Sequence, residues 1–521
     1  MLIESALVPL EQSENEKPEH ECGIGMIYTF DPSAKKNNLI AIGHALQHRG
    51  QNGAGIKTDA MAERKVGSGL LNKALSEDDQ SSLEIPSHWA MIHLRYGTSG
   101  GYGDMNLQPI SMEAVNGEIC DVEVNGNMPL MQHLRKKYDL PEDVSDTYIA
   151  THILSQLALD DWDSAILEFA ELEAIRESAN NMFIGVGDAM YVLRDRYGLH
   201  PLVVGQDENG RGLMYSSETV AFQKVGMKPS GEVPRGSITK LTPTGVTVLK
   251  EGNQSSGNAC IFEPAYFSSP NSSFPREGDE NPDEWMSNMH FRMRCGERVA
   301  TECPVPNADF MVGMPDSGVP FASGFANAAG IPYYPAIIRS HYNGDGDTRT
   351  FMQDAQMATI PTLVKGKLMP VVDPRMWKDK VVVIGDDSMV RGSNSKAITD
   401  MIWQLGVKEI HWRLGFPQVK FPCPLGVSFR SRDELIAAIT DGDVDKIAAL
   451  IGATSVGFIS NEGIIAATQD NVKDLRSADT NQIFLDNGWC GGCVTGHYPI
   501  KIYDMKEGTI FSSTRDNIYP T

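Results

Sequence analysis

The sequence predicts two domains of different fold class, an α+β domain followed by an α/β domain. From Cys22 to about Lys250, short strand-like runs such as CGIGMIYTF and HWAMIHLRYG are interrupted by few helical stretches, which favours antiparallel sheets. After about His290, continuous apolar runs are each followed by a polar turn and a helix, which favours a parallel sheet covered on both faces. A chain of 521 residues is long enough for both domains.

The first domain is expected to span residues 22–258 and the second 259–521. Helical periodicity in the first domain occurs at 41–47 and from 147 to about 175, between the strand-like runs. The polar segment EGNQSSG, which ends at Gly257, marks the predicted boundary, and the stretch 268–283 is expected to be a long loop. In the second domain, the segments that begin ADFMVGMPDSG and KVVVIGDDSMVRG each predict a strand, a turn and a helix.

The charge of the chain disfavours two classes of partner. Its 45 Lys and Arg residues stand against 68 Asp and Glu residues, a formal net charge of −23. Nucleic acids and anionic membranes need a basic face, so we expect neither as a partner, although a local loop can still hold a small phosphorylated substrate. The sequence holds no run of 18 or more apolar residues, so no membrane-spanning helix is expected.

The first 21 residues do not have the composition of a secretory signal. They contain six Glu and one Lys, with only a short apolar patch at 6–10. We therefore expect a cytoplasmic protein whose eight cysteines are thiols with metal-binding or catalytic roles rather than disulfides.

The segment VVVIGDDSMVRGSNS at 381–395 predicts a ligand site in the second domain. A buried-type strand delivers Asp386 and Asp387 at its carboxyl end, where ligands bind in open α/β sheets. The Gly/Ser/Asn loop then leads into a helix, whose backbone N–H groups can hold a phosphate. The acids can bind a diol or Mg²⁺. The plain alternative is an ordinary turn with solvated acids.

This segment resembles the phosphoribosyl-pyrophosphate (PRPP) motif of the type I phosphoribosyltransferases. It is neither a Walker A loop nor a dinucleotide-binding GxGxxG. The resemblance implies that the acids meet the ribose hydroxyls and that the loop holds the 5′-phosphate. The implied PRPP-binding residues are Asp386, Asp387, Ser388, Arg391, Gly392, Ser393, Asn394 and Ser395. Those implied for Mg²⁺ are Ser317, Asp386 and Asp387.

The first domain resembles the class II glutamine amidotransferases. The matching segments include CGIGMI at 22–27, ALQHRGQNGAGI at 45–56, HLRYGTSG at 93–100 and VNGNM at 124–128. The resemblance implies an N-terminal-nucleophile (αββα) fold in which residues 1–21 are a propeptide and Cys22 is the nucleophile. It also implies that Asn125 and Gly126 form the oxyanion hole, that Arg95 binds the glutamine carboxylate and that Asp146 binds its ammonium group.

The chemistry explains why such residues are needed. An amide is a poor electrophile, so its hydrolysis through an acyl-enzyme needs a thiol with a base beside it. An α-amine titrates near pH 8 (about 7.7–8.0), so a free amine on Cys22 could be that base. This requires cleavage between Glu21 and Cys22. Taken alone, Cys22 would more often be a core residue, NGN a turn and Arg95 a solvated side chain.

A class II glutaminase domain followed by a type I phosphoribosyltransferase domain resembles the glutamine PRPP amidotransferase family. Further matches are IFEPAYFSSPNSSF, MPDSG, IIRSHY and TRTFMQ. The resemblance implies a transferase that makes 5-phosphoribosylamine, pyrophosphate and glutamate from PRPP, glutamine and water, the first committed step of de novo purine biosynthesis. It also implies feedback inhibition by purine nucleotides and a homo-oligomer, either a homotetramer or a dimer.

Four cysteines indicate a further cofactor. Cys490 and Cys493 form a C-x-x-C in WCGGC, which alone indicates a metal or redox pair. Together with Cys260 and Cys423 they match family members that carry a [4Fe–4S] cluster, although four thiolates also suit zinc. The other three cysteines, Cys120, Cys295 and Cys303, are expected in the core.

The chain departs from the family in three places, which concern substrate affinity and regulation. The phosphate loop has Ser393–Asn394 where two threonines are usual, and SHYNGDGDTRTF adds Asp345 and Asp347 near the PRPP-covering loop. EPAYFSSP lacks an arginine that is common after the aromatic pair. Two alternatives to the PRPP amidotransferase function are kept apart from these departures: another class II amidotransferase, and a non-catalytic PRPP or nucleotide-binding regulator that keeps the fold.

Overall fold

The computed structural model describes the chain in thirteen stretches. They are 22–31, 33, 36–96, 103–159, 161–253, 257–276, 278–339, 368–427, 431–469, 479, 482–500, 502–504 and 509–511. The predicted propeptide 1–21 and the acidic pair Asp345 and Asp347 lie outside the described residues.

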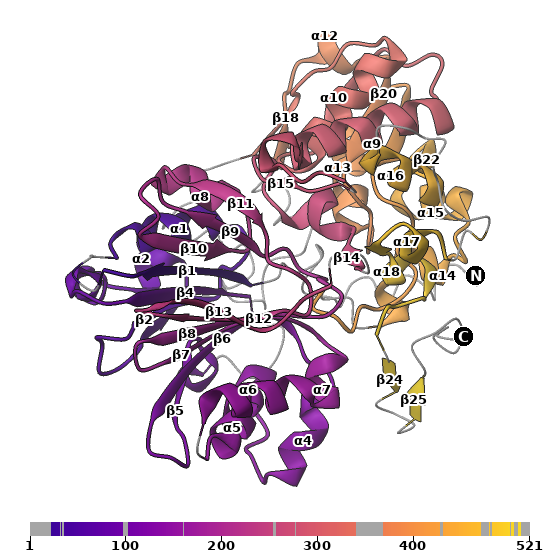
Figure 1. Ribbon diagram of the computed structural model, residues 1–521. Coiled ribbons are helices and arrows are strands. Elements are labelled where there is room, and N and C mark those ends of the chain that lie inside the picture. The colour runs from indigo at the N-terminus through magenta and orange to yellow at the C-terminus, as the bar shows by residue number, and fades with distance from the viewer. Residues whose placement is uncertain are drawn as a thin grey trace.

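The first domain contains two antiparallel sheets packed face to face (Figure 1). In spatial order the first sheet consists of β11 (Lys228–Glu232), β9 (Val203–Gln206), β10 (Gly212–Ser216), β1 (Gly23–Thr29), β4 (Trp89–Arg95), β2 (Gly53–Thr58) and β3 (Lys65–Ser68). The second consists of β13 (Gly245–Lys250), β12 (Ile238–Thr242), β8 (Ala189–Arg194), β7 (Ala179–Val186), β6 (Ile119–Asn127) and β5 (Ile110–Glu113).

Strand alternation explains why these sheets need a helix layer on each outer face. In β1, Ile24 and Met26 point into the layer between the sheets, where they join Phe183 and Val192 of the second sheet. Helices α1 (Asn38–Leu46), α2 (Leu71–Ala74), α3 (Glu77–Ser81) and α8 (Val220–Val225) lie by the first sheet. Helices α4 (Met131–Lys137), α5 (Asp146–Leu157), α6 (Trp162–Glu171) and α7 (Glu173–Arg176) lie by the second.

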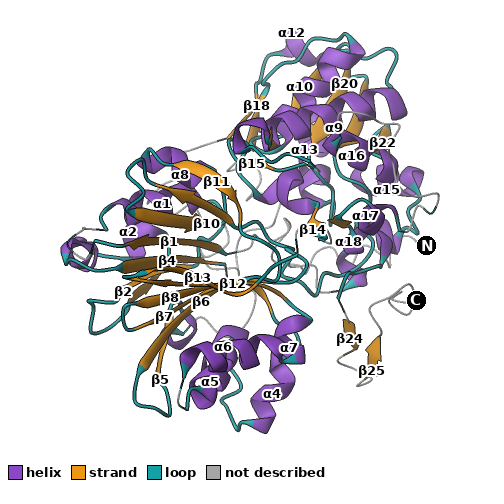
Figure 2. Cartoon of the chain, in the orientation of Figure 1, coloured by secondary structure: helices purple, strands orange, loops and turns teal. Residues whose placement is uncertain are grey.

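The helical periodicity predicted from 147 to 175 is divided among α5, α6 and α7. Asp161 causes the first division because its side chain caps α6 by accepting hydrogen bonds from the backbone N–H groups of Asp163 and Ser164. The predicted helix at 41–47 covers the last six residues of α1 and its C-cap, Gln47. The helix–sheet–sheet–helix order of the first domain is visible in Figure 2.

The second domain is built on a four-stranded parallel sheet with helices on both faces (Figures 1 and 2). The strands in spatial order are β17 (Phe310–Gly313), β20 (Val381–Asp386), β21 (Glu409–Leu414) and β22 (Ser455–Phe458). One face packs on α9 (Asn288–Glu302), α10 (Gly318–Ala329) and α16 (Asn461–Thr468). The other packs on α12 (Pro374–Trp377), α13 (Ser393–Trp403), α14 (Ile436–Ile439) and α15 (Val444–Ile451).

Short paired strands surround these cores. They are β14 (Ala259–Cys260) with β23 (Trp489–Cys490), β15 (Ser273–Phe274) with β16 (Met286–Ser287), β18 (Ile337–Arg339) with β19 (Leu368–Pro370), and β24 (Ile502–Asp504) with β25 (Thr509–Phe511). Two short helices, α17 (Ile483–Asp486) and α18 (Gly492–Thr495), flank β23. The predicted fold class, an αββα domain followed by a parallel α/β domain, is confirmed.

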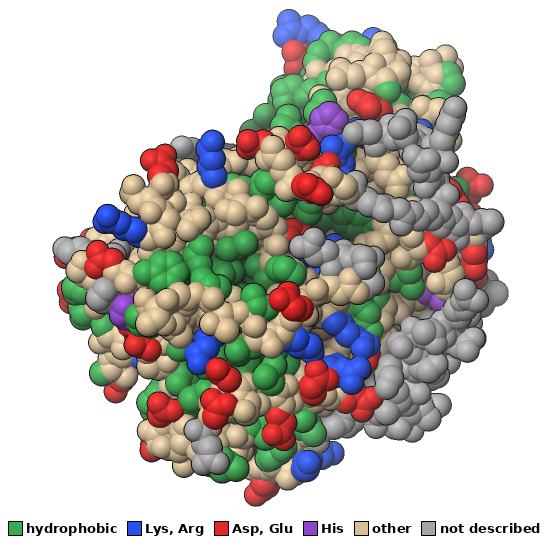
Figure 3. Space-filling model, viewed as in Figure 1, with side chains coloured by type: hydrophobic (Ala, Val, Ile, Leu, Met, Phe, Trp, Pro, Cys, Tyr) green, Lys and Arg blue, Asp and Glu red, His purple; other side chains and the backbone are tan. Residues whose placement is uncertain are grey.

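Two observations bear on the expected partners. Within the described part of the chain, no helix has the length and apolarity needed to cross a membrane. On the face shown in Figure 3, acidic side chains are spread over both domains and interspersed with smaller groups of basic ones.

Candidate active sites and the cysteine site

Cys22 lies at the edge of the inter-sheet layer, immediately before β1. Because β1 pairs with β4 so that Gly23 lies opposite Leu94, Cys22 is placed beside Arg95 and Tyr96. The Cys22 Sγ accepts a hydrogen bond from the Tyr96 N–H at 3.4 Å. Burial raises the pKa of the Cys22 thiol to about 11, against smaller lowering effects of Tyr96 and Arg95. The thiol is therefore protonated at neutral pH and needs a base to become a nucleophile.

The predicted oxyanion residues lie near the end of strand β6, in the second of the two facing sheets. Asn125 is fully buried, and neither its side-chain oxygen nor its nitrogen has a hydrogen-bond partner in the described structure. Gly126 adopts φ +148°, and a Cβ there would lie 2.0 Å from the Ala179 carbonyl oxygen, so only glycine fits. A buried amide without a partner beside a glycine backbone is an arrangement that can receive an oxyanion.

Arg95 and Asp146 supply opposite charges near the thiol. Arg95 ends β4 with 4% of its surface exposed, and it lowers the pKa of Cys22, whereas Asp146 raises it. Asp146 begins α5, and its carboxylate accepts the Met128 N–H at 2.9 Å. This bond ties the helix to the residue that follows β6. The structure thus brings together Cys22, Arg95, Asp146 and the Asn125–Gly126 pair, which lie far apart in the sequence.

A buried ion network behind Cys22 was not predicted. The fully buried Arg49 donates from Nε to the Cys22 carbonyl oxygen at 3.2 Å. Its other nitrogens donate to Glu218 at 2.8 Å and to Glu263 at 2.7 Å. Burial alone would raise the pKa of Glu218, but His48 and Arg49 lower it to about 2. Arg49 lies in the motif QHRG and Glu263 in the motif IFEP. Both motifs are visible in the sequence, but no feature of it indicates that these two side chains form an ion pair.

The second predicted site lies at the carboxyl end of β20. Asp386 ends the strand, Asp387 follows it, and both are at least nine-tenths buried. The Asp387 N–H donates to Asp386 Oδ1 at 2.9 Å and the Ser388 hydroxyl to Asp387 Oδ1 at 3.0 Å. Asp387 Oδ2 is buried without a hydrogen-bond partner in the described structure. One carboxylate oxygen is therefore held ready for a ligand.

The loop after these acids leads into α13 as the sequence predicts. Gly392 precedes the helix with φ +84°, and a Cβ there would meet Ile436 at 2.5 Å. The Ser393 hydroxyl, in the first turn, has no partner in the described structure, and Ser395 is buried. The eleven-residue helix α13 also includes Asn394, so its N-terminal N–H groups are available to an anion.

Two predicted ligand residues have different surroundings. Ser317 lies in the loop after β17. This loop packs closely on the end of β20, as Gly318 shows: a Cβ added there would lie only 2.9 Å from the Asp386 Cα. Ser317 and Asp386 thus share one sheet edge. Arg391 instead donates from Nε to Glu434 at 3.0 Å, with its Nη1 lacking a partner in the described structure.

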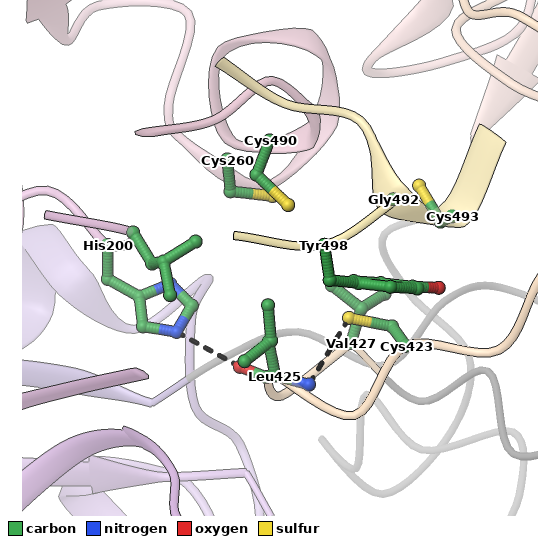
Figure 4. Close-up of a pocket in the computed structure, with 10 residues that line it drawn as sticks. His200, Cys260, Cys423, Leu425, Val427, Cys490, Gly492, Cys493 and Tyr498 are labelled. Carbon is green, nitrogen blue, oxygen red and sulfur yellow. Dashed lines mark hydrogen bonds between the residues drawn. The ribbon is translucent and has the colours of Figure 1, made fainter. Parts of the chain in front are cut away.

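The four predicted cluster cysteines line one cavity (Figure 4). Cys260 and Cys490 are opposite residues of the parallel pair β14–β23, and their sulfurs lie side by side. Burial is the main cause that raises the pKa of the Cys493 thiol well above its usual value, and the neighbouring Cys423 and Cys490 thiols raise it further. The glycines of WCGGC are needed, because a Cβ on Gly491 or Gly492 would lie 2.3 or 2.2 Å from an aromatic ring.

The remaining three cysteines lie elsewhere. Cys120 and Cys295 are buried, as expected, whereas Cys303 is half-buried with its thiol 3.6 Å from the Phe458 carbonyl oxygen. Across the stretches that the structure describes, no group of three His, Cys, Asp or Glu residues is placed to hold a single metal ion.

Comparisons with known proteins agree with these two halves. No protein-family model matches the chain. The chloroplastic amidophosphoribosyltransferase of Vigna aconitifolia is 33% identical over 509 residues, covering 96% of this chain and 96% of that protein. The amidophosphoribosyltransferase of Synechocystis sp. is 31% identical over 509 residues, covering 95% and 94%.

A solved structure shows the same likeness in three dimensions. The glutamine PRPP amidotransferase from B. subtilis, complexed with ADP and GMP, matches with a TM-score of 0.76 and 28% identity. The match covers 95% of this chain and 100% of that one. With nearly full-length relatives above 30% identity, the chain belongs to the amidophosphoribosyltransferase family.

Proposed function

We propose that this chain makes 5-phosphoribosylamine, pyrophosphate and glutamate from PRPP, glutamine and water, in the first committed step of de novo purine biosynthesis. The observation that carries this proposal is the presence of both half-sites in one family member. The first domain holds the buried Cys22 thiol in one sheet and a buried, unpartnered Asn125 amide in the other, and in the second domain an acidic strand end precedes a helix N-terminus.

In the glutaminase half, the Cys22 thiol attacks the side-chain carbonyl of glutamine. Asn125 and the Gly126 N–H stabilise the oxyanion, and Arg95 and Asp146 hold the α-carboxylate and α-ammonium groups. Removal of residues 1–21 frees the Cys22 amine, which accepts the thiol proton and passes it to the leaving ammonia. Water then releases glutamate from the thioester. The buried, protonated thiol supports the need for this base.

In the phosphoribosyl half, ammonia replaces pyrophosphate at C1 of the ribose. Asp386 and Asp387 bind the ribose hydroxyls, and the loop from Ser388 to Ser395 holds the 5′-phosphate with backbone N–H groups and hydroxyls. Arg391 is proposed to act through its unpartnered Nη1. Ammonia formed in the first domain travels inside the protein to this site.

The acids of this half also fit a magnesium ion. Hard carboxylate and hydroxyl oxygens are the ligands that Mg²⁺ prefers, and it is usually held by one or two carboxylates together with substrate phosphates. Asp387 Oδ2, which is buried and unpartnered in the described structure, meets this requirement. We assign the ion to Ser317, Asp386 and Asp387, where it would neutralise charge on the departing pyrophosphate.

The four thiols around the cavity fit a [4Fe–4S] cluster. Four thiolates also suit a single zinc ion, which needs its sulfur ligands within about 2.3 Å of one point. In a four-iron cluster each thiolate binds a different iron, so the ligands surround a volume instead. Cys260, Cys423, Cys490 and Cys493 surround such a volume, and a cluster there would fasten the segments that carry them.

Regulation and assembly follow from the family. The relative from B. subtilis was solved with ADP and GMP, so we propose that purine nucleotides inhibit this chain as well. We further propose a homo-oligomer, a homotetramer or dimer, in the cytoplasm, where glutathione keeps the eight cysteines reduced.

The test is a coupled assay on anaerobically purified protein. With Mg²⁺, PRPP and glutamine, we expect stoichiometric glutamate and pyrophosphate, and ammonium should replace glutamine in pyrophosphate release. Intact mass should show residues 1–21 absent. A glutaminase that PRPP does not stimulate would favour another class II amidotransferase. Tight nucleotide binding without turnover would favour the non-catalytic regulator.

A further inference from the structure

Two consecutive carbonyl groups of the second domain contact side chains of the glutaminase domain. Asn127 Nδ2 donates to the Pro424 carbonyl oxygen at 2.7 Å, and His200 Nε2 lies 3.2 Å from that of Leu425. Since a carbonyl oxygen can only accept, Nε2 carries the proton. The same segment reaches the cysteine cavity, because the Leu425 N–H donates to Cys423 Sγ at 3.4 Å (Figure 4).

The first of these contacts is made at the end of β6, the strand that carries Asn125 and Gly126. Asn127 is the last residue of β6 and directly follows Gly126. Asn125 has no side-chain hydrogen bond in the described structure, so its direction is set by the strand that carries it. The bond from Asn127 to Pro424 fixes the end of that strand against the segment that follows Cys423.

The second contact leads to the nucleophile through buried groups. His200 Nδ1 lies 3.5 Å from Glu263 Oε1 without a hydrogen bond between them, so this contact is an ion pair that attracts when the ring carries both protons. Arg49 Nη2 approaches the same Glu263 oxygen to 2.7 Å. Arg49 Nε in turn donates to the Cys22 carbonyl oxygen. His200 and Arg49 are almost completely buried, so none of these contacts is weakened by solvent. The carbonyls of adjacent residues thus reach the nucleophile and the oxyanion strand separately.

We propose that Asn127 and His200 are positioning residues of the glutaminase half, through which the Cys423–Leu425 segment sets the place of Cys22 relative to Asn125 and Gly126. This rests on the proposed function. A misplacement of about 1 Å at a reacting centre lowers turnover by roughly 100-fold. If Cys423 is not held in the cysteine site, the Cys423–Leu425 segment can shift, and full glutamine turnover is lost. Phosphoribosyl transfer from free ammonia does not depend on this segment.

Matched variants test the two contacts. We expect Asn127→Ala to lower kcat for glutamine hydrolysis by about 10- to 100-fold with KM for glutamine within about twofold, because alignment and not binding is lost. Pyrophosphate release with ammonium stays at the wild-type rate. Asn258→Ala is the control, because Asn258 Nδ2 makes a similar bond to the Leu485 carbonyl oxygen, two residues from Cys260, without reaching the catalytic strands.

His200 allows a rescue experiment. His200→Leu removes the donor to Leu425 and should lower kcat, whereas His200→Gln keeps an amide donor at similar reach and should restore most of it. The rate at which iodoacetamide alkylates Cys22, read from its peptide by mass spectrometry, should change in His200→Leu and not in Asn127→Ala. Equal loss in His200→Leu and His200→Gln would contradict the positioning role.

A thermodynamic-cycle experiment that combines Asn127→Ala with iron removal from the cysteine site completes the test. Iron and labile-sulfide content is measured first, and the iron is then removed with a chelator from the wild type and from Asn127→Ala. We expect removal to reproduce the kcat loss in the wild type and to add little in Asn127→Ala, because both act through one segment. Additive losses overturn the proposal. A wild type that lacks both the PRPP-stimulated glutaminase and the ammonium reaction instead refutes the proposed function.

Discussion

The two candidate half-sites are built in opposite ways. The candidate glutaminase site takes side chains from the residue before β1 and from β4, β6 and α5, and it supports them with buried charges, among them Arg49 bound to Glu218 and Glu263. The phosphoribosyl site takes nearly all its groups from one continuous stretch, 386–395, where a strand ends and a helix begins.

This difference determines how each site should respond to change. In the candidate glutaminase site the proposed catalytic groups depend on partners from several elements, so a distant substitution can displace them. In the phosphoribosyl site the backbone of one βα unit places the ligand groups, so the effects of substitution should stay local. The half-reactions can be assayed separately, with glutamine hydrolysis for one and ammonium-dependent pyrophosphate release for the other.

The largest expected effect is that of Cys22→Ala. Loss of the proposed nucleophile should lower glutamine-dependent synthesis by about 10⁴-fold or more, while ammonium-dependent synthesis is retained because the second domain is untouched. Cys303→Ala is the control, since that half-buried thiol has no proposed catalytic role. A fully active protein that retains residues 1–21 would show that the N-terminal amine is not the base.

The second largest effect is expected for Asp387→Asn, which should impair the phosphoribosyl reaction and leave glutamine hydrolysis intact. Removing the charge of a buried carboxylate that has an unpartnered oxygen should lower ammonium-dependent synthesis by roughly 10²- to 10³-fold, with PRPP-independent glutamine hydrolysis unchanged. Asp400→Asn, on the exposed face of α13, should leave both reactions at wild-type rates. Equal activity of the two variants would remove Asp387 from the site.

The contrast between the half-sites also explains what the sequence could predict. The phosphoribosyl loop is contiguous, so the order of strand, acids, glycine and helix could be read directly along the chain. The αββα fold and the positions of Cys22, Arg95, Asn125 and Asp146 came from resemblance, because residues on separate strands show no mutual distance in a sequence.

The buried ion network around Arg49 could not be predicted from the sequence, for a physical reason. Fully buried charges are rare, so Arg49, Glu218 and Glu263 would each be expected at the surface. Only the fold shows that they neutralise one another. The same holds for the cysteine site, where the two-residue strands β14 and β23 are too short to leave a pattern, yet their pairing brings Cys260 beside Cys490.

The pH dependence of Cys22 alkylation should sharpen the account of the glutaminase half. Because burial raises the pKa of the thiol to about 11, its thiolate fraction in the uncleaved chain rises about tenfold per pH unit from pH 7 to 10. The rate constant for iodoacetamide at the Cys22 peptide should follow that rise. A plateau near pH 8.5, as for an ordinary thiol, would contradict the burial effect. After cleavage, the free amine should bring the plateau to lower pH.

The smallest effect concerns Glu123, which shows the cost of buried charge in the first domain. Its carboxyl is fully buried on β6, neither oxygen has a hydrogen-bond partner in the described structure, and burial raises its pKa. The folded chain therefore keeps a proton that the unfolded chain releases above about pH 4.3, so this group lowers stability as pH rises.

Glu123→Gln removes that proton equilibrium while nearly keeping the shape of the side chain. The variant should match the wild type near pH 4 and gain stability over it by about 1.4 kcal/mol per pH unit above the unfolded pKa, until the folded pKa is reached. Thermal unfolding between pH 5 and 8 measures this as a widening gap in Tm, roughly 2–4 °C per kcal/mol. Glu113→Gln, at an exposed position on the neighbouring strand β5, should show no such widening. A constant gap at all pH values would mean that Glu123 is ionised in the folded protein and therefore has a charged or polar partner in the inter-sheet layer.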